Sequence, residues 1–143
     1  MSMLADILVV DDNHGFLQVA RQVLGTGSPA FAVHTVETGS QALAFLEQRA
    51  PYDGVPRPAF VLLDFRLPDM TAAMLLETLA ARGLRGVLPI LVLSQAAWEE
   101  DEAAARAAGA TGYAVKPSRV RALREMVVAF WRDQVHGHPD PAD

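Results

Sequence analysis

The sequence predicts an α/β protein: a three-layer sandwich in which helices cover both faces of a five-stranded parallel sheet. Short unbroken apolar runs, such as Phe60–Leu63, are typical of strands that are buried on both faces. Segments with helical spacing of apolar residues separate these runs, so that strand and helix alternate five times without an internal repeat. Helical connections make the strands parallel and the crossovers right-handed.

The first half of the chain contains two of these strand–helix units. The predicted strands are Ile7–Val10 and Ala30–His34. Asn13 is placed to cap the first helix, and Thr38-Gly39-Ser40-Gln41 has the spacing of a capping box at the start of the second. The second helix ends before Pro51, because proline cannot continue a helix.

The second half contains three further units after a proline-containing surface loop over residues 52–58. Four acidic residues crowd the first turns of the fourth helix, where the helix macrodipole favours negative charge. Ser118 is placed to cap the last helix, whose inward face is predicted to include Val120. The predicted elements are strands over 60–64, 89–94 and 111–115 and helices over 70–82, 99–109 and 118–135.

Length and composition narrow the class of protein. The 143 residues suffice for one domain, and 51% hydrophobic with 20% charged residues fits a globular protein. No apolar run approaches the roughly 20 residues that span a bilayer, and the N-terminus lacks the features of a secretory signal. The absence of cysteine favours a cytoplasmic location, and the net charge of −5 argues against nucleic-acid binding.

Polar side chains follow four of the five predicted strands. Asp11 and Asp12 end the first strand, Asp64 the third, Ser94 the fourth and Lys116 the fifth. Because parallel strands end at the same edge of a sheet, these groups are expected in one crevice. Taken singly, each is weak evidence, since acids and serines near strand ends often cap helices. Their joint placement is a strong signal of a functional site.

Three clustered carboxylates need a compensating charge, since two of them about 5 Å apart repel by about 3 kcal/mol at an effective dielectric constant of about 20. A divalent cation and the Lys116 ammonium are the available candidates. Oxygen-only ligands select Mg²⁺ or Mn²⁺ over zinc. Such a site suits attack by a carboxylate on phosphorus, with Lys116 and the Ser94 hydroxyl binding phosphoryl oxygens.

On these residues the chain resembles the receiver domain of two-component response regulators, from Leu4 to about Trp131. The matched residues are the pair Asp11-Asp12, Asp64 within Leu62-Leu63-Asp64-Phe65-Arg66-Leu67-Pro68, Ser94, Tyr113 and Lys116-Pro117. The resemblance implies a flavodoxin-like (βα)5 fold. It also implies that the protein is no enzyme beyond catalysing its own phosphorylation and dephosphorylation.

The resemblance assigns a role to each matched residue. Asp64 would be the phosphoacceptor that takes a phosphoryl group from a histidine kinase, with Lys116 and Ser94 binding that group. Mg²⁺, or Mn²⁺ in its place, would be ligated by Asp12, Asp64 and the backbone carbonyl of Arg66, and by Asp11 through water. The peptide bond before Pro117 would be cis.

A conformational switch is implied as well: Ser94 moves toward the phosphoryl group and the Tyr113 ring turns inward. Two departures from the family pattern stand beyond Asp64. Ala72 occupies a position that is usually glycine and follows Thr71, where the family has an acid, so an uncommon loop path is expected. Arg66 is a bulky cation beside the acceptor, and we expect it and Gln95 to control the access of attacking water and thus the phosphoaspartate lifetime.

Residues 4–135 are expected to form the receiver domain, and residues 136–143 a disordered tail whose histidines could touch a metal. With no residues left for an output domain, signalling would proceed by protein–protein interaction. The last helix also carries Met126, Val128, Trp131 and Val135, which favours a homodimer through the fourth helix, fifth strand and fifth helix; alternatively, Trp131 covers the sheet edge.

The partner can be narrowed by a closer resemblance. The loop Asp53-Gly54-Val55-Pro56-Arg57-Pro58 and the ending Phe130-Trp131-Arg132 are similar to single-domain regulators paired with bacterial phytochromes. A red-light-sensing histidine kinase or phosphatase is therefore the expected partner; alternatively, the loop is only stiffened by proline.

Two competing functions remain open. A pseudo-receiver adaptor would keep the fold and signal without phosphate, which the retention of Asp12, Asp64, Ser94 and Lys116 disfavours. A phosphohydrolase with an aspartate nucleophile would need a second acid two residues after the first strand's aspartate. Only His14 could stand in for that acid.

Overall fold

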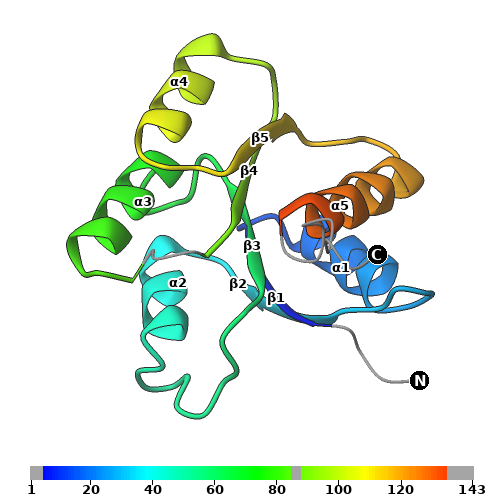
Figure 1. Cartoon of the computed structure of the whole chain (residues 1–143), viewed down its shortest axis with the longest axis horizontal. Helices are drawn as coiled ribbons and strands as arrows, with labels where there is room; N and C mark the ends of the chain where they lie inside the picture. Colours follow the sequence, from blue (N-terminus) through cyan, green and yellow to red (C-terminus); the bar gives the residue numbers. More distant parts are fainter. Residues whose placement is uncertain (1–4, 85–87, 135–143) are drawn as a thin grey trace, which may run out of the picture.

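The computed structural model describes residues 5–84 and 88–134, which form one five-stranded parallel sheet in the order β2-β1-β3-β4-β5 (Figure 1). This arrangement confirms the predicted flavodoxin-like fold. The strands are β1 (Asp6–Val10), β2 (Ala32–Val36), β3 (Phe60–Asp64), β4 (Ile90–Ser94) and β5 (Gly112–Val115).

Helices cover both faces of the sheet. Figure 1 shows α1 and α5 on one face and α2, α3 and α4 on the other, which gives three layers. None of the helices within the described residues is both long and apolar enough to span a bilayer. The helices are α1 (His14–Leu24), α2 (Gly39–Leu46), α3 (Ala72–Ala81), α4 (Glu99–Ala107) and α5 (Val120–Gln134).

The central strands divide their side chains between two cores, which explains their unbroken apolar sequence. In β1, Ile7 and Val9 pack with α1 and α5, whereas Leu8 and Val10 pack with α2 and α3. Strands β3 and β4 are buried at every position. Each fully buried aliphatic side chain contributes about 1.5–3 kcal/mol. The strand ends are therefore held in a rigid frame.

Two predicted N-cap residues, Asn13 and Thr38, are confirmed. The Asn13 side chain accepts a hydrogen bond from the Phe16 amide at 3.0 Å. The Thr38 hydroxyl accepts one from the Gln41 amide at 3.0 Å, which is the first half of the capping box. The second half is shifted, because the Gln41 side-chain oxygen accepts from the Glu37 amide at 2.7 Å.

Several predicted boundaries are wrong by one or two residues. Strand β2 begins at Ala32, because the Phe31 amide donates to the Leu24 carbonyl at the end of α1 at 2.8 Å. The Phe31 side chain is fully buried and packs edge-on against Phe60, with ring centroids 5.8 Å apart. Helix α3 begins after Thr71, whose hydroxyl caps it. Helix α5 begins at Val120, whose side chain is 53% exposed, so it does not belong to the predicted inward face.

Further expectations concern the proline bonds and the chain end. In the described part of the chain, cis peptide bonds precede Pro29 and Pro51 only, so the expected cis bond before Pro117 is wrong. The two isomers of an X–Pro bond differ by only about 0.5–1 kcal/mol, so surrounding structure decides between them. Val135 and the tail over 136–143 lie outside the described residues.

Candidate functional site

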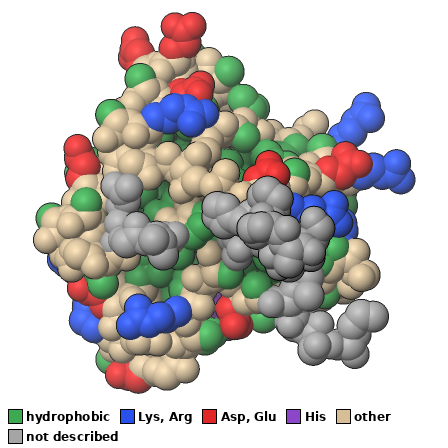
Figure 2. All heavy atoms as spheres, in the orientation of Figure 1, with side chains coloured by type: hydrophobic (Ala, Val, Ile, Leu, Met, Phe, Trp, Pro, Cys, Tyr) green, Lys and Arg blue, Asp and Glu red, His purple; other side chains and the backbone are tan. Residues whose placement is uncertain are grey.

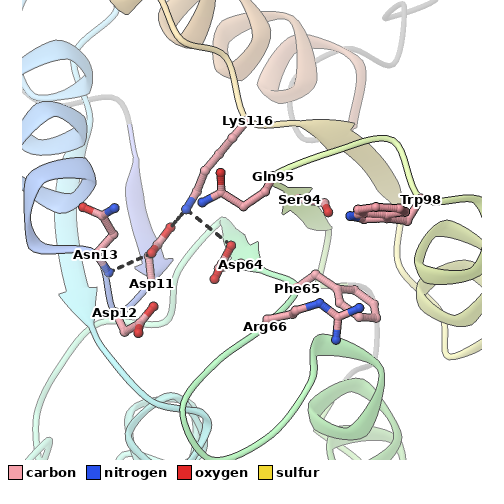
Figure 3. A pocket seen from close by; sticks show the side chains of 10 residues that line it. All are labelled: Asp11, Asp12, Asn13, Asp64, Phe65, Arg66, Ser94, Gln95, Trp98 and Lys116. Atoms are coloured by element: carbon pink, nitrogen blue, oxygen red, sulfur yellow. Dashed lines mark hydrogen bonds and ion pairs between the residues drawn. The ribbon is translucent and has the colours of Figure 1, made fainter.

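The strand ends meet as the sequence predicts. Val10 on β1 lies beside Leu63 on β3, Asp64 beside Leu93 on β4, and Ser94 beside Val115 on β5. The ends of these strands open into a cavity of about 320 Å³, which is lined by the predicted site residues other than Tyr113, with Arg66 and Gln95 among them (Figure 3).

Three carboxylates form the acidic part of the site. Asp11 is 1% exposed and Asp64 is 8% exposed, whereas Asp12 is open to solvent. One carboxylate oxygen from each lies within 4.8 Å of those of the other two. Asp11 is further fixed because its Oδ1 accepts a hydrogen bond from the Asn13 amide at 2.9 Å.

Lys116 is the cation of the site, and Figure 3 shows it reaching down from the end of β5 between two of the carboxylates. Its Nζ lies 2.6 Å from Asp11 Oδ2 and 3.4 Å from Asp64 Oδ1. The same Nζ lies 4.6 Å from the centre of the Phe16 ring, a cation–π contact. A hydrogen bond of 2.7 Å from the Lys116 amide to the Ser94 carbonyl fixes the base of the side chain.

The negative charge of Asp64 is unfavourable in its surroundings, and Lys116 compensates it only in part. Burial of the carboxyl, followed by the charge of Asp11, raises its pKa; Lys116 lowers the pKa, and Asp12 adds a smaller upward effect. The net result is a pKa of about 6, compared with 3.8 for an ordinary aspartate. A further cation beside Asp64 would compensate this charge.

The donor set fits a hard divalent cation. All three side chains offer carboxylate oxygens, which are the ligands that Mg²⁺ and Mn²⁺ prefer. Asp12 is exposed and gives an ion access to the cluster. The Arg66 carbonyl belongs to a closed loop, because Arg66 pairs with Thr71 and the Ala72 amide donates to the Phe65 carbonyl at 2.7 Å.

The predicted switch residues occupy different surroundings. Ser94 is 4% exposed and lines the cavity, with the exposed Gln95 next to it. Tyr113 does not line the cavity; its half-buried ring packs against the core beneath α2, α3 and α4. Within the described residues, the Tyr113 hydroxyl is buried and has no hydrogen-bond partner. The site thus gathers Ser94 directly and leaves Tyr113 on the neighbouring strand.

The structure adds residues that the sequence pattern did not single out. Trp98, 58% exposed, lines the cavity where α4 begins. The Arg66 guanidinium binds the carboxylate of Asp101, an acid that the sequence explains by the helix macrodipole alone. The contact between Arg66 and Asp101 has no local sequence signal, because it joins segments that are far apart in the chain.

Asp69 ties the loop after Asp64 to the start of α2. Its carboxylate accepts hydrogen bonds from the Gly39 amide at 2.9 Å, the Ser40 amide at 3.0 Å and the Ser40 hydroxyl at 2.8 Å. Desolvation raises the pKa of Asp69, but these hydrogen bonds outweigh it and hold the pKa below its usual value. The loop is thereby fixed to a neighbouring helix.

Fold and site together define a class. The profile of the response regulator receiver domain matches residues 7–128, and the chain therefore belongs to this family. Receiver domains are the parts of two-component systems that histidine kinases phosphorylate.

Among its relatives are regulators of phytochrome signalling. The chain is 28% identical over 132 residues to the response regulator Rcp1 of Synechocystis sp., which covers 90% of each chain. It resembles the solved structure of the phosphorylated cyanobacterial phytochrome response regulator RcpA, with a TM-score of 0.80, 25% identity and coverage of 91% and 93%. For the Mn²⁺-bound form of Rcp1, the TM-score is 0.78 at 26% identity, with coverage of 93% and 96%.

The raised pKa of Asp64 leads to a prediction for the metal-free protein. Stability from the protonated carboxyl is fully present below pH 4 and is lost as the pH rises through about 6. Asp64→Asn should therefore stabilise the fold at pH 8 in EDTA by roughly 2 kcal/mol, and this gain should vanish near pH 4.

Urea denaturation of both proteins at several pH values measures this difference. Asp53→Asn, on the exposed loop before β3, serves as the control and should leave stability unchanged. An Asp64→Asn variant that is less stable than the wild type at pH 8 would contradict the electrostatic account.

Proposed function

We propose that this receiver domain is switched by phosphorylation of Asp64. The observation that carries this proposal is the buried Asp64 carboxylate at the cavity floor, 3.4 Å from Lys116 Nζ and within 4.8 Å of two further carboxylates. A nucleophile, a fixed cation and a set of metal ligands thus face one space. Residues 4–135 would act as one receiver unit and signal through protein contacts.

The reaction is a phosphoryl transfer between two side chains. An Asp64 carboxylate oxygen attacks the phosphorus of a phosphohistidine, the P–N bond breaks, and the departing imidazole nitrogen keeps the electron pair. Lys116 holds one phosphoryl oxygen and the Ser94 hydroxyl donates to another. Mg²⁺ or Mn²⁺, ligated by Asp12, Asp64 and the Arg66 carbonyl, with Asp11 acting through water, would neutralise phosphoryl charge.

Reversal of the signal is hydrolysis of the acyl phosphate. Water attacks phosphorus, the P–O bond to Asp64 breaks, and inorganic phosphate leaves as the free carboxylate returns. In the switch that we propose, Ser94 shifts toward the phosphoryl group and Tyr113 follows inward. Within the described residues, the buried Tyr113 hydroxyl has no hydrogen-bond partner that would hold the ring in place, which supports this movement.

A phytochrome-class histidine kinase is the partner that we propose. Support comes from the relatives Rcp1 and RcpA, the latter described as a phytochrome response regulator. The loop over 53–58 is anchored where the Gln48 side chain donates to the Val55 carbonyl at 2.7 Å, next to the exposed Pro56.

Phosphotransfer profiling should identify the partner. Radiolabelled histidine kinases, a phytochrome kinase among them, are incubated with the wild-type protein and with Asp64→Asn. We expect rapid Mg²⁺-dependent labelling from the phytochrome kinase and none in Asp64→Asn, because the amide cannot form the acyl phosphate. Equal labelling of both proteins would contradict Asp64 as acceptor, and faster labelling by another class of kinase would contradict the partner.

The adaptor function makes a different prediction for the same protein. A pseudo-receiver would show no Asp64-dependent response to beryllofluoride, a phosphoryl mimic, with Mg²⁺ present. The contact of the His14 ring with Glu37 at 2.8 Å, outside the cavity lining, counts against the phosphohydrolase function.

Arg66 and Gln95 should set the phosphoaspartate lifetime, since both line the cavity. We expect Arg66→Ala and Gln95→Ala each to speed dephosphorylation about threefold to tenfold, or roughly 0.7–1.4 kcal/mol of barrier, because water gains access. Release of phosphate after a pulse of labelling measures the rate. Unchanged rates in both variants would show that neither residue controls water.

A homodimer through α4, β5 and α5 is the assembly that we propose. Val115 at the end of β5 and Val120 at the start of α5 are 42% and 53% exposed. Figure 2 shows acidic side chains over α4 at the top of the view and basic ones where α5 begins at the right, an arrangement that suits antiparallel charge pairing. Trp131 contributes less than expected, because it packs edge-on against Phe31 at 5.8 Å and covers the sheet edge.

Light scattering tests the dimer. At high concentration, the wild-type protein with Mg²⁺ and beryllofluoride should have twice the monomer mass, and Val120→Glu should reduce it to the monomer. Phe31 and Trp131 are untouched by this variant, so the core stays intact. A wild-type monomer with and without the phosphoryl mimic would contradict the proposal.

A further inference from the structure

Arg66 belongs to the acceptor loop but is bound elsewhere. It follows Asp64 by two residues and lines the same cavity, yet its guanidinium turns away from the carboxylates in Figure 3. Its Nη2 donates to both carboxylate oxygens of Asp101, at 3.1 and 2.9 Å. The two side chains differ in burial: that of Arg66 is 68% exposed and that of Asp101 is 11% exposed.

Asp101 depends on this contact. A buried carboxylate is costly unless a cation or hydrogen-bond donors compensate it. Over residues 5–84 and 88–134, Arg66 is the side chain that supplies this compensation. Because Arg66 is exposed, it can leave, and Asp101 would then have to reach water.

Apart from the contact between Arg66 and Asp101, few interactions hold helix α4 to the rest of the domain. Only Asp101 and Ala105 are buried among its residues 99–107. Trp98 stands at the N-cap position and makes no side-chain hydrogen bond to the first turn. The contact between Arg66 and Asp101 therefore fastens the start of α4 to the loop that carries the phosphoacceptor.

A phosphoryl group on Asp64 would compete for the same guanidinium. It brings about −1.5 to −2 charges and strong acceptor oxygens, and arginine forms charge-assisted hydrogen bonds to phosphoryl oxygens as it does to a carboxylate. The three-carbon stem of an exposed arginine allows the guanidinium to change partners. The gain of one contact is then tied to the loss of the other.

We propose that Asp101 is a positioning residue that holds Arg66 away from the unmodified acceptor, and that phosphorylation of Asp64 transfers Arg66 to the phosphoryl group and releases the first turn of α4. This inference rests on the proposed function. By linkage, whatever binds and stabilises the start of α4 must also weaken the hold on the phosphoryl group.

Hydrogen exchange over residues 98–107 and beryllofluoride titration test this coupling together. The variants are Arg66→Gln, Asp101→Asn and the double variant; Glu102→Gln is the matched control, since Glu102 pairs with Arg106 on the same helix at 2.8 Å. Without beryllofluoride, both single variants should exchange faster at α4 than the wild type, and the double variant no faster still. The wild type should reach that rate only after beryllofluoride binds, and Glu102→Gln should follow the wild type.

The titration separates a positioning role from a merely structural one. Asp101→Asn should bind beryllofluoride about fivefold more tightly than the wild type, because Arg66 is released in advance. In the Arg66→Gln background the same substitution should change nothing. Two results would overturn this inference and leave the proposed function standing. One is that Asp101→Asn tightens beryllofluoride binding equally in the wild-type and the Arg66→Gln backgrounds. The other is that the wild type binds beryllofluoride without faster hydrogen exchange at α4. A wild-type protein that binds no more beryllofluoride than Asp64→Asn overturns the proposed function and the inference with it.

Discussion

The site depends on one buried ion pair, between Lys116 and Asp11, whose atoms are 2.6 Å apart. A cluster of three acids at one sheet edge, with Asp11 and Asp64 buried, is unfavourable unless a cation lies in the same space. Lys116 supplies that cation from the end of β5, and its position is fixed by the sheet. Asp64 lies farther from the Lys116 ammonium, at 3.4 Å, so its negative charge is less fully compensated. A metal ion or a change in the charge of this carboxyl group would therefore have a large local effect.

The frame around this pair is uneven. Strands β1, β3 and β4 are almost wholly buried, so the groups at their ends keep their positions without help from the site itself. Helix α4 is the opposite case, with two buried residues and an exposed tryptophan at its start. A domain of this construction can hold its chemistry fixed while one neighbouring helix responds, which is what a signalling protein with a single site requires.

Much of this could be predicted from the sequence. The apolar runs indicate the strands, and the rule that parallel strands end at one edge of a sheet predicts that Asp11, Asp64, Ser94 and Lys116 lie together, as they do in the cavity. Contacts between distant segments could not be predicted. The acid at position 101 had a sufficient local explanation in the helix macrodipole, so no signal remained to indicate Arg66 as its partner. The later start of β2 likewise reflects the hydrogen bond from the Phe31 amide to the Leu24 carbonyl, which the local pattern does not indicate.

The hydrogen bonds between Asp69 and the start of α2 make the two ends of the acceptor loop differ in how firmly they are held. Three hydrogen bonds clamp the far end of the loop to a helix that is itself well buried, whereas the near end is joined to α4 by one exposed arginine. A change at Asp64 is therefore resisted on the α2 side, where three hydrogen bonds hold the loop, and less strongly on the α4 side, where one exposed arginine holds it. We therefore expect a change at Asp64 to displace the start of α4 and to leave α2 in place, so that one surface of the domain carries the response.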